Sequence, residues 1–140
     1  IAAIPALAFF IPLITAMGGN VGVQSSAIVV QSLAKGDFMF ASIFKRVSKE
    51  MVVALINGVL LSTIIYIISA FFEGQTLALV VSLSLFTVII FASVFGTVIP
   101  LLLDKYKIDP ALATGPFVTT LNDILGLFIY FTIGMLLYHL

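Results

Sequence analysis

Asp123 is the residue of this sequence whose position most strongly suggests chemistry. It lies in a run, residues 110–138, that contains no other Asp, Glu, Lys or Arg. If this run is a helix, a rise of about 1.5 Å per residue carries Asp123 about 20 Å from the start. A carboxylate at that depth in a membrane costs at least ~2.5–3.5 kcal/mol. We therefore expect it to face a cavity, a partner or a cation.

Small and polar residues precede this aspartate along the same run. Thr119 and Thr120 stand four and three positions before Asp123. In a helix, these two threonines therefore lie on the same face as Asp123. Pro116, which follows Gly115, has no N–H to donate to the carbonyl oxygen of Leu112. The pattern predicts that this oxygen is free to bind an ion or a water molecule.

The seam of small residues is predicted to continue beyond Asp123, through Gly126, Tyr130 and Gly134. Asn122 is also polar, but a helix turns it about 100° away from this seam. Carboxylates, hydroxyls and carbonyls all present oxygen, which hard divalent cations such as Mg²⁺ or Mn²⁺ prefer. The run is therefore predicted to form one wall of a cation path.

A single carboxylate is a small ligand set for a cation. Asp109 cannot complete it directly, because it lies about 21 Å from Asp123 along a regular helix. Asp109 instead has the position of a helix N-cap, with Pro110 as the first helical residue. A two-fold homodimer would bring a second copy of Asp123 to a common axis. We therefore expect that one subunit does not suffice.

The first uncharged run, residues 1–34, is too long for one simple span. As a single helix it would measure about 51 Å, against a hydrocarbon thickness of about 30 Å. Glycine weakens a helix by ~1 kcal/mol relative to alanine, so we expect unwinding where glycines and polar side chains gather. These residues are Gly18, Gly19, Asn20, Gly22, Gln24 and Ser25. They are predicted to line the path opposite the carboxylate, and tight packing of helices through the glycines is the alternative.

Composition and run lengths place the chain in a membrane. It is 62% hydrophobic and 9% charged, with a mean hydropathy of +1.32, whereas soluble domains carry about a quarter charged residues. There is no cysteine, which excludes disulfides and thiolate metal sites. Spans are predicted at about 1–34, 51–72, 77–103 and 110–138, and none alternates as barrel strands do. The predicted fold is an all-α integral membrane bundle, a single pore domain over residues 1–140.

The basic residues predict the orientation of this bundle. All of them fall in two of the three connections, and they are Lys35, Lys45, Arg46, Lys49, Lys105 and Lys107. The positive-inside rule makes that side cytoplasmic, with both ends of the chain on the other side of the cell membrane. Residues 35–50 are predicted to be a cytoplasmic connection, either an interfacial amphipathic helix or an ordinary loop. Glu50 and Glu73 are interpreted as helix caps or solvated charges.

The two polar clusters resemble the MgtE family of magnesium transporters and channels. The first match is Pro12 with Gly18-Gly19-Asn20-x-Gly22-x-Gln24-Ser25, and the second is Asp109-Pro110-Ala111 with Gly115-Pro116, Thr119-Thr120 and Asp123. Lys49-Glu50, leading into a helix with Gly58, also looks like the family pattern. The resemblance covers essentially the whole chain.

This resemblance implies a homodimer of five-helix transmembrane domains, with a pore at or near the subunit interface. It implies that Asp123 is the central Mg²⁺ site and that Asp109 lies near the cytoplasmic mouth. Family members carry cytoplasmic regulatory domains. Since four spans are visible, we expect this chain to be a piece that lacks the first helix and those domains.

Together these observations favour the pore of a divalent-cation channel or transporter, for hydrated or partly hydrated Mg²⁺, with Asp123 as its selectivity site. The alternative is a proton- or cation-coupled secondary transporter of another divalent metal, because such proteins also use buried carboxylates and broken helices. A non-transporting assembly subunit also stays open, since intramembrane charges pair with one another. We do not expect an enzyme, because no second carboxylate is near Asp123 in one subunit and no Ser–His or His cluster exists.

Overall fold

The computed structural model describes residues 3–36 and 40–138, and every regular element within these ranges is helical. In chain order the elements are α1 (Ala3–Phe9), α2 (Ile11–Ala34), α3 (Phe40–Phe72), α4 (Gln75–Lys105), the 3₁₀ helix η1 (Pro110–Ala113) and α5 (Pro116–Tyr138). Four helical stretches within these ranges are long and apolar enough to cross a membrane. The predicted all-α membrane bundle is confirmed.

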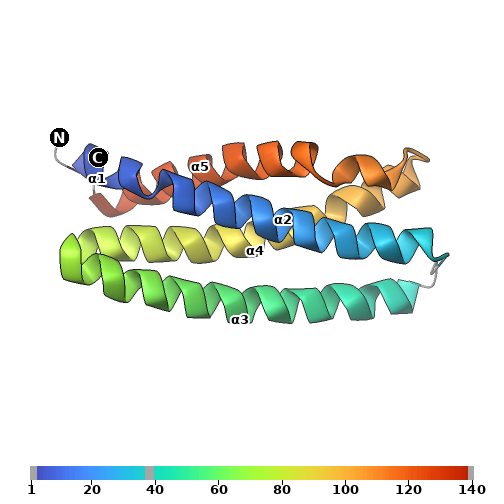
Figure 1. Cartoon of the computed structure of the whole chain (residues 1–140), viewed down its shortest axis with the longest axis horizontal. Coiled ribbons are helices and arrows are strands. Elements are labelled where there is room, and N and C mark those ends of the chain that lie inside the picture. The colour runs from blue at the N-terminus through green and yellow to red at the C-terminus, as the bar shows by residue number, and fades with distance from the viewer. Residues whose placement is uncertain (1–2, 37–39, 139–140) are drawn as a thin grey trace.

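The long helices run side by side, and α4 is the central one (Figure 1). It packs against α2, α3 and α5. In an apolar stretch of 18 residues within α4, 61% of the residues are buried inside the bundle. In the corresponding stretch of α3, 17% are buried. The side chains of α4 therefore supply much of the core, together with residues of the other helices such as Ile14 and Tyr130, whereas the outer face of α3 keeps exposed Val, Ile and Leu side chains that suit a lipid environment.

The helix ends divide between two ends of the bundle. The tight connection between α3 and α4 lies at the same end of the bundle as the start of α1 and the end of α5 (Figure 1). Gly74 in this connection has a φ of 93°, which side chains other than glycine rarely adopt. The opposite end holds the last turn of α2, the first turns of α3 and the last turn of α4 (Figure 1), and these carry or adjoin all the basic residues.

The first apolar run breaks at Phe10 and not at its glycine cluster. Helix α2 is continuous over Ile11–Ala34, glycines included, and Pro12 stands in its first turn, where a missing N–H costs no hydrogen bond. The predicted unwinding is therefore wrong. The glycines instead allow close packing: a Cβ atom on Gly96 of α4 would overlap the carbonyl oxygen of Gly22.

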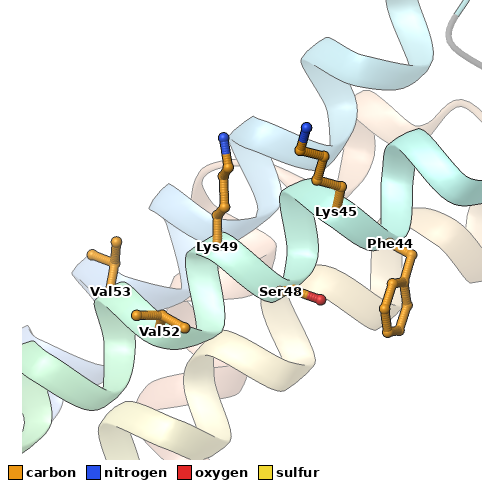
Figure 2. A pocket seen from close by; sticks show the side chains of 6 residues that line it. All are labelled: Phe44, Lys45, Ser48, Lys49, Val52 and Val53. Atoms are coloured by element: carbon orange, nitrogen blue, oxygen red, sulfur yellow. The ribbon is translucent and has the colours of Figure 1, made fainter.

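Most of the predicted connection between the first two spans is helical. Helix α3 begins at Phe40, so residues 40–50 extend the helix of residues 51–72 by about three turns. Residues 37–39 of the predicted connection lie outside the described residues. Figure 2 shows Lys45 and Lys49 projecting to the same side of this extension and Phe44 to another side. An interfacial position for this extension stays a prediction.

The last run is not one helix from residue 110. The 3₁₀ helix η1 is separated from α5 by a turn in which Gly115 has a φ of 71°. Pro116 is the first residue of α5, where its missing N–H interrupts nothing. The predicted reason for a free carbonyl at Leu112 does not hold, because no continuous helix joins Leu112 to Pro116.

Candidate cation site

Asp123 lies where α5 passes α2. A Cβ atom built on Gly19 of α2 would stand 3.5 Å from Asp123 Oδ1 and 3.2 Å from Thr119 Cγ2. Both Asp123 and Thr119 are half-buried. The carboxylate thus stands at an edge of the bundle, next to a helix that has no side chain at this point. Any side chain at Gly19 would compete with Asp123 for this space.

Three of the polar side chains predicted for the path are exposed. They are Asn20 and Gln24 of α2 and Thr120 of α5. Asn20 and Gln24 are four residues apart, so they share a face of α2. On α5, Thr119 Oγ1 donates a hydrogen bond to the carbonyl oxygen of Gly115 at 3.0 Å, which leaves its lone pairs able to accept. At Gly19 the edge therefore offers the Asp123 carboxylate and the Thr119 hydroxyl to a ligand.

The buried stripe of α5 runs through Asn122 and not through Asp123. Its members are Val118, Asn122, Gly126, Tyr130 and Gly134. Each is four residues from the next, so all five lie on the face of α5 that packs into the bundle. The predicted continuation of the Asp123 seam through Gly126, Tyr130 and Gly134 is therefore wrong. These three residues lie on the same helix face as Asn122.

Asn122 is a buried amide pressed against α2. It is 2% exposed, and neither Oδ1 nor Nδ2 has a hydrogen-bond partner in the part of the chain that the structure describes. Its side chain fills the space over Gly22, where a Cβ atom would overlap it. Gly18, Gly22 and Gly126, which the sequence predicted to line the pore, are accordingly buried between helices. They are packing positions and do not belong to the exposed edge.

The 3₁₀ helix η1 is capped by Asp109 and attached to α2. The Ala111 backbone N–H donates to Asp109 Oδ1 at 2.9 Å, so the predicted capping role is confirmed. Ser26 Oγ donates to the carbonyl oxygen of Ala113 at 2.7 Å, and both residues are buried. Since only Thr114 and Gly115 separate η1 from α5, this bond to α2 helps to fix the start of the helix that carries Asp123.

Ser25 and Glu50 lie inside the bundle, unlike the predicted pore-lining serine and solvated glutamate. Glu50 is 8% exposed in α3, and Ser25 is fully buried. Ser25 Oγ is 3.2 Å from Ser93 Oγ and 3.5 Å from Glu50 Oε1. Gln24 Nε2 donates to the same Glu50 oxygen at 3.1 Å. Sequence spacing could not reveal this cluster, because its side chains come from three helices.

The described residues of this chain do not form a multidentate acidic site. Among the described residues, no three His, Cys, Asp or Glu side chains are grouped closely enough to hold a metal ion. A hollow along the start of α3 is lined by Phe44, Lys45, Ser48, Lys49, Val52 and Val53 (Figure 2). It carries two cationic groups and no carboxylate, so it does not suit a cation. Asp123 therefore stays the candidate, with further ligands required from water or from another chain.

Comparison with known proteins points to one family. Residues 11–133 match the sequence model of the MgtE family, described as divalent cation transporter. The chain is 42% identical over 135 residues to a magnesium transporter MgtE of Bacillus subtilis and 38% identical over 136 residues to one of Thermus thermophilus. Each alignment covers 96% of this chain and 30% of the relative. A magnesium transporter MgtE of Enterococcus faecalis is 36% identical over 129 residues, with 91% and 28% coverage.

The range matched by the family model, residues 11–133, contains every residue predicted for the site. The chain spans less than a third of the length of the curated relatives, whose alignments cover 28–30% of them. A family described as transporters agrees with the prediction that the chain is not an enzyme. Because the family model matches residues 11–133 of 140, this chain belongs to the MgtE family of divalent cation transporters.

Proposed function

We propose that this chain forms part of a path by which Mg²⁺ crosses the cell membrane, with Asp123 as the central cation site. The observation that carries the proposal is the position of Asp123, half-buried within an apolar spanning helix and next to Gly19 of α2. A carboxylate at such a depth needs a compensating partner. A cation in transit is such a partner, and the relatives are named magnesium transporters.

The side chains near Asp123 suit a cation that keeps its water. Mg²⁺ releases water reluctantly and prefers oxygen ligands in octahedral geometry. The Asp123 carboxylate and the Thr119 hydroxyl offer acceptor oxygens beside Gly19, and the amide of Asn20, the next residue of α2, is exposed. Such oxygens can accept hydrogen bonds from water molecules held by the ion. Mn²⁺ uses the same kinds of ligand, so size and hydration must decide between the two ions.

A second copy of the chain would complete this site. Asn20 and Gln24 of α2 and Thr120 of α5 are exposed on helices long and apolar enough to cross the membrane. Polar groups at membrane depth are tolerated where they line a water-filled path or are buried in protein. A two-fold axis along the α2–α5 edge would place two copies of Asp123 across a shared polar path. We therefore propose a homodimer with the cation path between α2 and α5 of both subunits.

The cytoplasmic side of this path is proposed to be the basic end of the bundle. The end of α2, the start of α3 and the end of α4 lie opposite the start of α1 and the end of α5 (Figure 1). The positive-inside rule then places the termini outside. Asp109 caps η1 at the basic end, so it would stand at the cytoplasmic mouth.

The proposal is tested by Asp123→Asn in the full-length protein, reconstituted in liposomes that contain a Mg²⁺-sensitive dye. Asparagine keeps the shape of the side chain and removes its charge. Hydrogen bonds to charged groups are worth about 1.5–3 kcal/mol, so Mg²⁺ flux should fall at least about tenfold. Asp104→Asn changes an exposed carboxylate at the end of α4 and is the matched control, with flux retained. Unchanged flux in Asp123→Asn at equal protein content would refute the proposal.

The same liposomes distinguish this path from a coupled secondary transporter. In the proposed path, Mg²⁺ moves down its own electrochemical gradient. A pH gradient imposed without a Mg²⁺ gradient should therefore drive no uptake. Sustained Mg²⁺ or Mn²⁺ accumulation under that pH gradient would favour the coupled alternative, in which a carboxylate such as Asp123 carries the proton.

A further inference from the structure

The hollow at the start of α3 is a basic surface that the proposed cation path does not use. Lys45 and Lys49 line it together with Phe44, and Val52 and Val53 line the part that lies further along the helix (Figure 2). All five side chains are exposed. The hollow therefore presents two ammonium groups and, toward the middle of the helix, only apolar side chains.

The charge that α3 presents at this hollow is positive. Glu50 is the only acidic residue in the sequence of α3, and only 8% of it is exposed. Gln24 Nε2 of α2 donates a hydrogen bond to Glu50 Oε1 at 3.1 Å, so this carboxylate is held inside the bundle. Lys45 and Lys49 are exposed at the surface. An anion that approaches this part of α3 is therefore attracted, and it meets no carboxylate in the lining of the hollow.

The two lysines stand at the depth of lipid headgroups. The uncharged residues 51–72 of α3 measure about 33 Å as a helix, enough to cross a hydrocarbon layer of about 30 Å. Lys49 precedes this stretch by about 3 Å and Lys45 by about 9 Å along the helix axis. The headgroup layer adds about 5–8 Å on each side of the hydrocarbon. Because lysine side chains are long and flexible, both ammonium groups reach the lipid phosphates.

The apolar part of the hollow continues along the same face of α3. A second hollow is lined by mainly apolar side chains, which are Leu55, Ile56, Val59, Leu60, Thr63 and Ile64. Lys49, Val52, Ile56 and Val59 follow one another at intervals of three or four residues, so they share one helix face. One leaflet of hydrocarbon is about 15 Å thick, or about ten residues of helix. A lipid whose headgroup lies at Lys49 would therefore extend its acyl chain to about Val59.

We propose that the start of α3 binds a phospholipid with an anionic headgroup. Its phosphate lies at Lys45 and Lys49, and one acyl chain lies along Val52, Ile56 and Val59. Basic pockets of membrane proteins at headgroup depth bind anionic lipid heads in this way. A zwitterionic headgroup brings its own positive charge near the lysines and is bound less tightly. The site lies on α3, whereas the proposed cation path lies between α2 and α5, so this inference goes beyond that path and does not depend on it.

A lipid fits this face of α3 better than another helix does. Helices in membranes usually meet through small residues, which let their backbones approach. Two small residues in the spanning part of α3, Ala54 and Gly58, are buried, and a Cβ atom on Gly58 would stand 3.0 Å from Phe86 Cδ2 of α4. They are therefore already used within the bundle. The outer face carries exposed Val, Leu and Ile side chains, which flexible acyl chains cover without needing a matching surface.

Lipid binding by the full-length protein tests this inference. Native mass spectrometry of the purified protein in detergent, with phosphatidylglycerol or phosphatidylcholine added, gives the dissociation constant of each lipid. Phosphatidylglycerol should bind more tightly. Lys45→Gln and Lys49→Gln should each weaken its binding about fivefold, with little effect on phosphatidylcholine. Arginine at both positions keeps the charge and should keep the preference. An unchanged affinity for phosphatidylglycerol in the variant with both glutamines would overturn the inference.

The matched control is Lys105→Gln combined with Lys107→Gln. These two lysines are also exposed, and they lie at and just after the end of α4, at the same end of the bundle. The control removes the same charge, so it reports the general attraction between the protein and anionic lipids. The affinity for phosphatidylglycerol should stay unchanged. An equal loss in the control and in the Lys45 and Lys49 double variant would indicate a diffuse basic surface instead of a site on α3, and it would overturn the inference.

A photoreactive lipid locates the acyl chain. Phosphatidylglycerol with a diazirine in the middle of one acyl chain is cross-linked to the full-length protein in liposomes, and the modified peptides are sequenced. Cross-links should fall on residues 52–60 and should be lost in the Lys45 and Lys49 double variant. Cross-links confined to other helices would mean that a second copy of the chain or another helix covers this face, which contradicts the inference. Displacement of the lipid by glycerol 3-phosphate would assign the lysines to a soluble anion and would contradict it equally.

Discussion

Replacing Gly96 by alanine tests the closest helix contact in the bundle. The new Cβ atom would overlap the carbonyl oxygen of Gly22 and would lie 3.1 Å from both C and Cα of Gly22. The opposing atoms are all backbone, so no side-chain rotation can relieve the overlap. Helices α2 and α4 would have to separate, and α2 carries the edge next to Asp123. The substitution should therefore destabilise the bundle and disturb the site.

The expected cost follows from two opposing terms. In a helix, alanine is favoured over glycine by ~1 kcal/mol. Overpacking a close contact usually costs about 1–3 kcal/mol, and more where backbone must move. If the two helices move apart by about 0.5–1 Å, the atoms in contact lose about a quarter to a half of their van der Waals attraction. Because the opposing atoms are backbone, we expect a cost at the upper end of this range, so after the gain in helix propensity Gly96→Ala should lower the free energy of unfolding by about 2 kcal/mol.

The matched control is Gly126→Ala. Its Cβ atom would stand 3.4 Å from Val88 Cγ1, an ordinary contact with a side chain that can adjust. Both variants gain the same helix propensity, so their difference isolates the contact with Gly22. Unfolding of the reconstituted protein, followed by circular dichroism during titration with denaturing detergent, measures this difference. If Gly96→Ala were as stable as Gly126→Ala, the close crossing of α2 and α4 would be refuted.

Three further substitutions test contacts that hold the helices around the site. Ser26→Ala leaves the buried Ala113 carbonyl without its donor, so stability should fall by about 1–3 kcal/mol and Mg²⁺ flux should fall with it; wild-type values for both would contradict the link between η1 and α2. Tyr130→Phe removes the 2.9 Å bond to the Leu7 carbonyl and should lower stability by a similar amount in the same titration, whereas no loss would argue against that bond. Asp109→Ala should cost about 1 kcal/mol locally, seen as faster hydrogen exchange of the backbone amide two residues later; unchanged exchange would mean that the cap is not formed in the membrane.

Much of the architecture could be predicted because it depends on local composition. Long apolar runs that lack charges must form helices in lipid, since each backbone group then finds its partner within the run. The cap at Asp109 is equally local, because the donor lies two residues away. The depth of Asp123 follows from counting residues along one apolar run. The boundaries at Phe10 and Pro116 were predicted less well, because each depends on how a proline and its neighbours are packed.

The glycine cluster of α2 shows where local reasoning failed. Glycine both weakens a helix and allows helices to approach, and the sequence alone cannot choose between these effects. In the structure the glycines allow close packing, since Gly96 of α4 and Asn122 of α5 occupy the space next to Gly22. These partners are distant in the sequence. Packing energy between helices therefore outweighs the intrinsic preference of the glycines.

The sequence by itself determined that this chain is a helical membrane protein with one deep carboxylate, because hydropathy and charge act residue by residue. Tertiary structure alone decided what surrounds that carboxylate. It placed Asn122 inside and Asp123 at the α2–α5 edge, and it joined Gln24 to Glu50 and Ser25 to Ser93. These contacts join residues 26 and 68 positions apart. They exist because neighbouring helices bring their side chains together, and no periodicity within one helix encodes them.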